Sequence, residues 1–387
     1  MLTWQTWRLA APLMVLLVGG GVAWAHSWFW RRRLLRELRS TWGHLPGDRC
    51  GIAVARALHD IDPERPARDR HIIDDRTWED LEFDHVFARL DRCVSPVGSQ
   101  VLYRTLRSLR LDEHELTRRH RLVELLSRNH TLREPLQLCL THVRGRSASR
   151  VAELLWREPP RMTAIGDVAP VLALVAAVVL ALAWAGTFSW AAVFPVLVVN
   201  GIVHFAHRRG IDEVPLSQLG ALIGAARRIA ALDSADLAAL CPAIRRSADR
   251  SAKLARSLAL LSLDDGLGII QYLKIYFLID VLAYSASRAA VQRDVAGLRS
   301  LFEEVGMIDA AHSVASYLTE HAHHCHPEFT APRASWGFAA LRHPLLASPS
   351  PYDFSVDGCG VLVTGSNMSG KTTFLKAIAV NAVFAQS

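Results

Sequence analysis

The feature that most constrains the fold is a glycine-rich loop in residues 360–387, which read GVLVTGSNMSGKTTFLKAIAVNAVFAQS. The segment from Gly365 to Thr372 has the spacing G-x-x-x-x-G-K-[ST]. The apolar run from Val361 to Val363 before it predicts a buried parallel strand. The stretch from Thr373 to Gln386 after it contains neither Pro nor Gly and predicts a helix. The alternative is a chance match of the pattern in an ordinary turn.

This spacing suits a phosphate-binding loop. Glycines let the backbone wrap closely around phosphate oxygens, and the N-terminus of the following helix adds partial positive charge. Lys371 is expected to reach the β- and γ-phosphates, and the Thr372 hydroxyl is expected to bind Mg²⁺, so the predicted cofactors are ATP and Mg²⁺. The predicted cofactor-binding residues are Gly365, Ser366, Asn367, Met368, Ser369, Gly370, Lys371, Thr372 and Thr373. No catalytic residue is assigned.

A long apolar stretch, Leu9 to Trp30, precedes Arg31-Arg32-Arg33. Its length suits a bilayer span, and the arginines place the following chain in the cytoplasm. A cleaved signal peptide is the alternative, but the basic residues lie on the wrong side of the apolar stretch for one. We therefore expect an uncleaved membrane anchor.

Two further apolar runs, Val168 to Ala185 and Ala191 to Ala206, are joined by the short segment 186–190. Arginines flank both outer ends, which predicts a transmembrane hairpin with both ends in the cytoplasm. A buried core hairpin is the alternative. A hydrophobic content of 51% agrees with membrane segments, and the net charge of +7 permits contact with nucleic acid or an anionic membrane surface. The predicted location is the inner or plasma membrane, with the soluble regions cytoplasmic.

The remaining chain predicts helices. In Asp74 to Leu109, apolar residues recur at helical spacing before and after a turn at 95–98, which indicates a helical hairpin. Leu267 to Tyr284 contains Lys274 and Asp280 and is interpreted as a core helix, not a span. The histidine-rich segment 321–326 is too dense to surround one ion and is interpreted as a solvated helix end, so no metal other than Mg²⁺ is assigned. The six cysteines are far apart and are expected to be reduced thiols.

The loop from Thr364 to Phe374 resembles the P-loop of the MutS family, in which an Asn-Met pair stands where this chain has Asn367-Met368. Leu341 to Leu346 (LRHPLL) is similar to the Arg-His-Pro segment at the entrance of that family's ATPase domain. Leu90 to Leu106 resembles the opening of the family's core helical domain, and Phe302 to Tyr317 resembles the helix that packs its lever against the ATPase domain.

The resemblance implies a clamp-forming, DNA-binding ATPase that works as a homodimer with composite ATP sites. Three departures stand beside it. The chain has no Gly-x-Phe-Tyr-Glu-like wedge for reading mismatches, the apolar runs suggest a membrane-anchored subgroup, and the sequence ends 22 residues after Gly365, before any Walker B acidic residues. We therefore interpret the chain as truncated just after the Walker A helix and expect it to hydrolyse ATP poorly or not at all.

The expected fold is mainly α, with transmembrane helices, a MutS-like helical core and lever, and the first strand, P-loop and helix of an α/β ATPase domain. The expected regions are an N-terminal anchor (1–30), a cytoplasmic core-like region (31–163), a transmembrane hairpin (164–207), a core and lever region (208–340) and a truncated ATPase domain (341–387). The function expected from the resemblance is ATP-dependent DNA binding of the mismatch-repair or damage-sensing type. The alternatives are a transporter-type membrane ATPase and a non-catalytic membrane scaffold with a vestigial P-loop.

Overall fold

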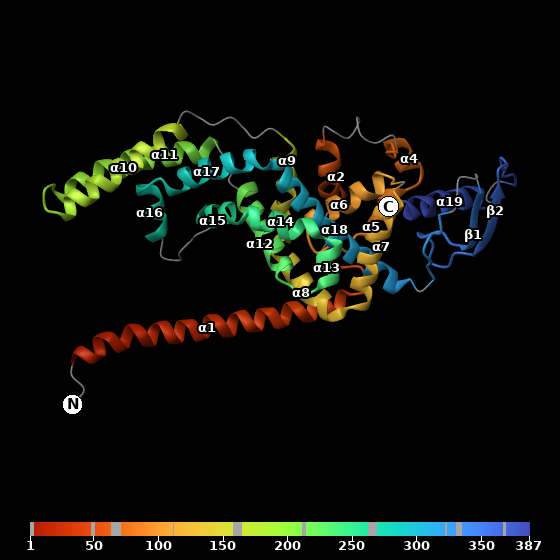
Figure 1. Ribbon diagram of the computed structural model, residues 1–387, viewed down its shortest axis with the longest axis horizontal. Coiled ribbons are helices and arrows are strands. Elements are labelled where there is room, and N and C mark those ends of the chain that lie inside the picture. The colour runs from red at the N-terminus through yellow and green to blue at the C-terminus, as the bar shows by residue number, and fades with distance from the viewer. Residues whose placement is uncertain are drawn as a thin grey trace.

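The computed structural model describes residues 4–47, 51–62, 71–110, 112–157, 165–210, 214–261, 269–321, 323–329, 335–366 and 369–387. Within these ranges the protein is mainly α, with 18 α-helices and one two-stranded antiparallel sheet (Figure 1). The mainly α class predicted from the sequence is confirmed.

The helices of the first half of the chain are α1 (Trp4–Thr41), α2 (Ile52–Ile61), α4 (Asp75–Asp80), α5 (Phe83–Leu90), α6 (Pro96–Arg107), α7 (Glu113–Arg128), α8 (His130–Leu140), α9 (Arg150–Trp156) and α10 (Ile165–Trp184). Those of the second half are α11 (Val193–Gly210), α12 (Val214–Ala230), α13 (Ala235–Leu240), α14 (Pro242–Arg250), α15 (Ala252–Leu261), α16 (Ile269–Tyr276), α17 (Ile279–Arg293), α18 (Val295–Glu320) and α19 (Lys371–Ala385). The strands are β1 (Ser335–Leu341) and β2 (Tyr352–Asp357).

The helical body is built around α18, which packs against α6 and α7. The side chain of Ser95 accepts a hydrogen bond from Gly98 N and Pro96 occupies the first turn, so α6 begins where the sequence predicted a turn and a new helix. Gly306 of α18 lies so close to α6 that a Cβ at this position would overlap Val101. The two segments that the sequence singled out, 90–106 and 302–317, are therefore in direct contact.

A buried carboxylate joins these two segments. Asp309 of α18 accepts hydrogen bonds from Val94 N and Ser95 N, both at 2.8 Å, and from Ser95 Oγ at 2.6 Å. One helical turn further, Ser313 Oγ donates to Leu90 O and accepts from Arg92 N. The connection between α5 and α6 is thus held on α18 through its backbone groups, whose burial requires such partners.

Helix α1 projects from the body, and the contacts described for it lie near its C-terminal end (Figure 1). Arg39 forms an ion pair with Glu134 at 2.7 Å, and Glu37 forms one with Arg144 at 2.9 Å. The helices α10, α11, α16 and α17 form an arm that extends toward the same side of the molecule as α1, whereas β1, β2 and α19 lie at the opposite end (Figure 1). The predicted apolar segments therefore share one side of the molecule.

The predicted hairpin of apolar helices is present as α10 and α11, joined through a turn at Gly186. By length and composition, one helix among the described residues, Trp190–Arg208, could cross a membrane, and a shorter apolar helix, Val168–Trp184, lies beside it. The helix predicted over Leu9 to Trp30 is part of α1, but most of its side chains lie outside the described residues.

The single core helix predicted over Leu267 to Tyr284 is wrong in part. The described part of this segment forms two helices, α16 and α17, separated at Leu278, whose backbone is left-handed with φ of 52°. Lys274 and Asp280 lie on either side of this break, with Lys274 Nζ 3.4 Å from Asp280 Oδ1 and both side chains buried. The break places the two opposite charges together, which lowers the cost of burying them.

The strand predicted at Val361 to Val363 is also wrong. This run has no regular secondary structure, and Leu362 is 87% exposed. A parallel strand is stable only between neighbouring strands and under covering helices. In the described part of the chain the sheet consists of β1 and β2, which are antiparallel to each other and do not pair with residues 361–363.

Candidate nucleotide-binding loop

The loop predicted to bind phosphate is curled around the side chain of Lys371. Its Nζ donates to Gly365 O at 2.5 Å and to Ser366 O at 2.6 Å, both at the start of the loop. The side chain of Lys371, at the end of the loop, is therefore bound to the backbone at its start. Carbonyl oxygens are weaker partners than phosphate oxygens for this charge, so an incoming phosphate can replace them.

The two glycines of the pattern differ in how strongly the backbone needs them. A Cβ at Gly365 would lie 2.8 Å from Ser369 Oγ, so the serine side chain would have to rotate away. Gly370 has a φ of 83°, a left-handed conformation that favours glycine, and it directly precedes α19. Gly370 thus suits the observed backbone because of its conformation, whereas Gly365 gives room for the Ser369 side chain.

Helix α19 presents its N-terminus to the loop. Phe374 N donates to Gly370 O at 2.9 Å, so the N–H groups of the preceding residues begin the helix without a partner in its backbone ladder. Such N–H groups and the helix dipole favour an anion at this end. Thr372 is exposed, which leaves its hydroxyl open to a metal ion. Thr373 lies in the same turn, whereas Asn367 and Met368 lie outside the described residues.

Helix α19 is docked on the helical body by its other face. Val380 and Val383 are buried in an apolar cluster with Phe83 and Phe87 of α5. Lys376 forms an ion pair with Glu82 at 3.2 Å. A shift of α19 would therefore also displace α5, whose C-terminal end leads into the connection held by Asp309.

The segment Leu341 to Leu346 lies between α5 and α19. Asn381 Nδ2 of α19 donates to Arg342 O at 3.0 Å, and Arg89 Nη1 of α5 donates to Pro344 O at 3.1 Å. Residues 341–346 thus contact both α5 and α19, close to where α5 leads into the segment 90–106.

Sequence reasoning missed the contribution of β2. The rings of Tyr352 and Phe354 lie 5.5 Å and 5.4 Å from the ring of Phe374 in the first turn of α19. Alternating aromatic residues at 336 and 338 and at 352 and 354 are the period-two signal that would have predicted these strands. Tyr352 and Phe354 thus pack on the first turn of α19, directly after the loop.

Comparisons with known proteins add no assignment. No protein-family model matches the chain, and no curated protein matches it. Among the residues that the structure describes, no group of three or more His, Cys, Asp or Glu side chains is arranged to hold a metal ion.

Proposed function

We propose that this chain is a membrane-anchored, MutS-like protein that binds ATP and Mg²⁺ through the loop from Gly365 to Thr373. The observation that most supports ATP binding is Lys371, whose ammonium group lies across a loop that ends in the left-handed Gly370 and opens onto a helix N-terminus. DNA as partner and assembly as a homodimer belong to the same proposal and rest on the family resemblance.

The residues present fit the predicted cofactors. Lys371 would exchange its two carbonyl partners for phosphate oxygens, and the Thr372 hydroxyl would be one ligand of Mg²⁺. The metal would neutralise phosphate charge and orient the triphosphate. The proposal concerns binding and not hydrolysis, because the loop supplies the phosphate cradle and a single metal ligand.

The distribution of side chains on the arm supports membrane insertion. The buried residues of α10 are small, Ala169, Ala176 and Ala183, one every seven residues. Its outer face is large and apolar, including Val171 and Leu174. Small residues inside and large apolar residues outside are the arrangement of helices packed in lipid.

Helix α11 has the same arrangement with a polar interior. Asn200, His204 and His207 share one buried face, and Asn200 Nδ2 donates to Tyr276 O at 2.5 Å. Phe194 and Ile202 on the other faces are 68% and 65% exposed. In water such a helix would expose its apolar residues and bury its polar ones, whereas in a bilayer this arrangement is favourable.

Replacing Lys371 by Ala is expected to weaken ATP binding by about 10- to 100-fold, because a charge-assisted contact to phosphate is lost. The measurement is titration of the purified full chain in detergent with ATP and Mg²⁺. Lys376→Ala is the matched control, since Lys376 lies on the same helix but pairs with Glu82. Equal affinities of Lys371→Ala and wild type would refute the proposed site.

The membrane topology predicts which thiols an impermeant reagent reaches in intact cells. Phe188 lies at the tip of the α10–α11 hairpin and is exposed, so Phe188→Cys is expected to be labelled from outside. The native Cys325 and Cys359 are also exposed but belong to the cytoplasmic side, and are expected to react only after lysis. Labelling of Phe188→Cys only after lysis would contradict a spanning hairpin.

A further inference from the structure

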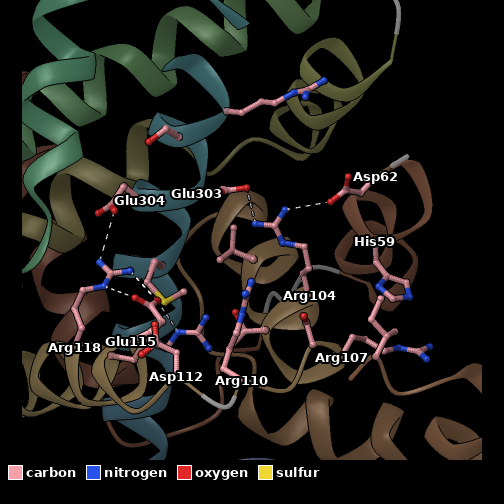
Figure 2. A pocket seen from close by; sticks show the side chains of 18 of the residues that line it. His59, Asp62, Arg104, Arg107, Arg110, Asp112, Glu115, Arg118, Glu303 and Glu304 are labelled. Atoms are coloured by element: carbon pink, nitrogen blue, oxygen red, sulfur yellow. Dashed lines mark hydrogen bonds and ion pairs between the residues drawn. The ribbon is translucent and has the colours of Figure 1, made fainter. Parts of the chain in front are cut away.

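A cavity of about 910 Å³ lies between α6, α7 and α18 (Figure 2). It is close to the C-terminal end of α19, since Arg110 at its rim donates a backbone hydrogen bond to Gln386 O at 2.9 Å. The P-loop lies at the other end of this 15-residue helix, roughly 22 Å away at 1.5 Å per residue. The cavity is therefore separate from the proposed ATP site.

Six arginines line the cavity: Arg104, Arg107, Arg110, Arg118, Arg119 and Arg299. Three of them have structural partners. Arg104 pairs with Glu303 at 2.9 Å and with Asp62 at 3.7 Å, Arg107 donates to Tyr103 and to the backbone at Ile73, and Arg299 donates to Leu155 O. These contacts hold the walls of the cavity together.

The three arginines on the α7 side have fewer partners than donors. Arg118 and Arg119 share one carboxylate, Glu115, with Nε–O distances of 2.8 and 3.0 Å. Nη1 of Arg119 is buried and has no hydrogen-bond partner. The side chain of Arg110 is exposed and makes no hydrogen bond or ion pair with the described residues, and Figure 2 shows it directed into the cavity.

The cavity lining has nearly as many carboxylates as arginines, namely Asp62, Asp112, Glu115, Glu303 and Glu304. Arg118 is held by Glu115, by Glu304 at 3.6 Å and by Leu240 O, to which its Nη1 donates at 2.9 Å. The carboxylate of Asp112 caps α7 by accepting from His114 N. Arg110 and Arg119 are therefore the arginines on this side with the fewest partners among the described residues.

We propose that this cavity binds a phosphate-bearing small molecule of about mononucleotide size, with its phosphate on Arg110 and Arg119. A phosphate group has enough acceptor oxygens for both guanidinium groups at once. Val101, Trp156 and Met307 also line the cavity and suit an organic group. The volume lies in the range of small-molecule sites.

The test is calorimetric titration of the full chain in detergent with AMP, and separately with inorganic phosphate, in the Lys371→Ala background. This substitution weakens nucleotide binding at the P-loop, so AMP binding that persists belongs to another site. AMP is expected to bind, inorganic phosphate to bind more weakly, and Arg110→Ala to weaken AMP binding by about tenfold or more. Because Arg110 is exposed, its replacement is expected to leave the fold intact.

Arg128→Ala is the matched control. It also removes one arginine charge, but from the end of α7 and outside the lining of this cavity. It is expected to leave AMP affinity unchanged, and a loss equal to that of Arg110→Ala would overturn the proposal by showing a general charge effect. Absence of AMP binding in Lys371→Ala would also overturn it. Neither result would affect the proposed ATP site, which is tested by ATP binding to the chain with an intact P-loop.

Discussion

Replacing Asp309 by Ala is expected to lower the free energy of unfolding by about 3 kcal/mol or more. The side chain is fully buried and accepts from Val94 N, Ser95 N and Ser95 Oγ, so its removal leaves three donors without an acceptor. Each buried donor left unpaired costs about 1–3 kcal/mol, and the lost side chain also leaves a cavity. The connection between α5 and α6 would be held on α18 less tightly, with the hydrogen bonds of Ser313 still in place.

The measurement is chemical unfolding of the full chain in detergent, followed by helical circular dichroism at pH 8, where the carboxylate is ionised. Asp249→Ala on α14 is the control, because that side chain is exposed, and we expect it to change stability by no more than about 0.5 kcal/mol. A similar small change for Asp309→Ala would show that the three hydrogen bonds contribute little to stability.

The helices around Asp309 were predictable, but their polar contacts were not. Ser95-Pro96 is a local signal for a helix start, and the structure places the start of α6 there. In Phe302 to Tyr317, Asp309, His312 and Ser313 look like the solvated face of an amphipathic helix. They are instead buried against α6 and α8, because their partners are backbone and side-chain groups far away in sequence.

The candidate site, too, was predictable from the sequence only in part. The spacing of Gly365, Gly370 and Lys371 predicts the loop from sequence alone, since each has a local geometric reason. The strand at Val361 to Val363 was not predictable, because apolar character alone does not provide the neighbours that a parallel strand requires. The arginine-lined cavity has no sequence signal either, since α6, α7 and α18 supply its walls from positions about 200 residues apart.

Two buried titratable groups on α18 have opposite effects on stability as the pH changes. Burial lowers the pKa of His312 from 6.5 to about 3, and nearby Arg133 acts in the same direction. Burial raises the pKa of Asp309 from 3.8 to about 7, although its hydrogen bonds oppose the shift. Between pH 4 and 6.5 the unfolded chain binds a proton at His312 that the folded chain lacks, and the folded chain binds one at Asp309 that the unfolded chain lacks.

His312→Gln is expected to reveal the contribution of Asp309. In the wild type, lowering the pH makes His312 reduce the free energy of unfolding and makes Asp309 increase it. Each contribution is about 1.4 kcal/mol per pH unit, so the two largely cancel. Gln at position 312 can retain a hydrogen bond to Gln137, which lies 2.6 Å from His312 Nε2, and does not titrate. As the pH is lowered from 6.5 to 4, the free energy of unfolding of the variant should therefore rise relative to that of the wild type by about 1.4 kcal/mol for each pH unit. The measurement is chemical unfolding of both proteins across this range, and parallel curves would show that His312 does not resist protonation in the folded state.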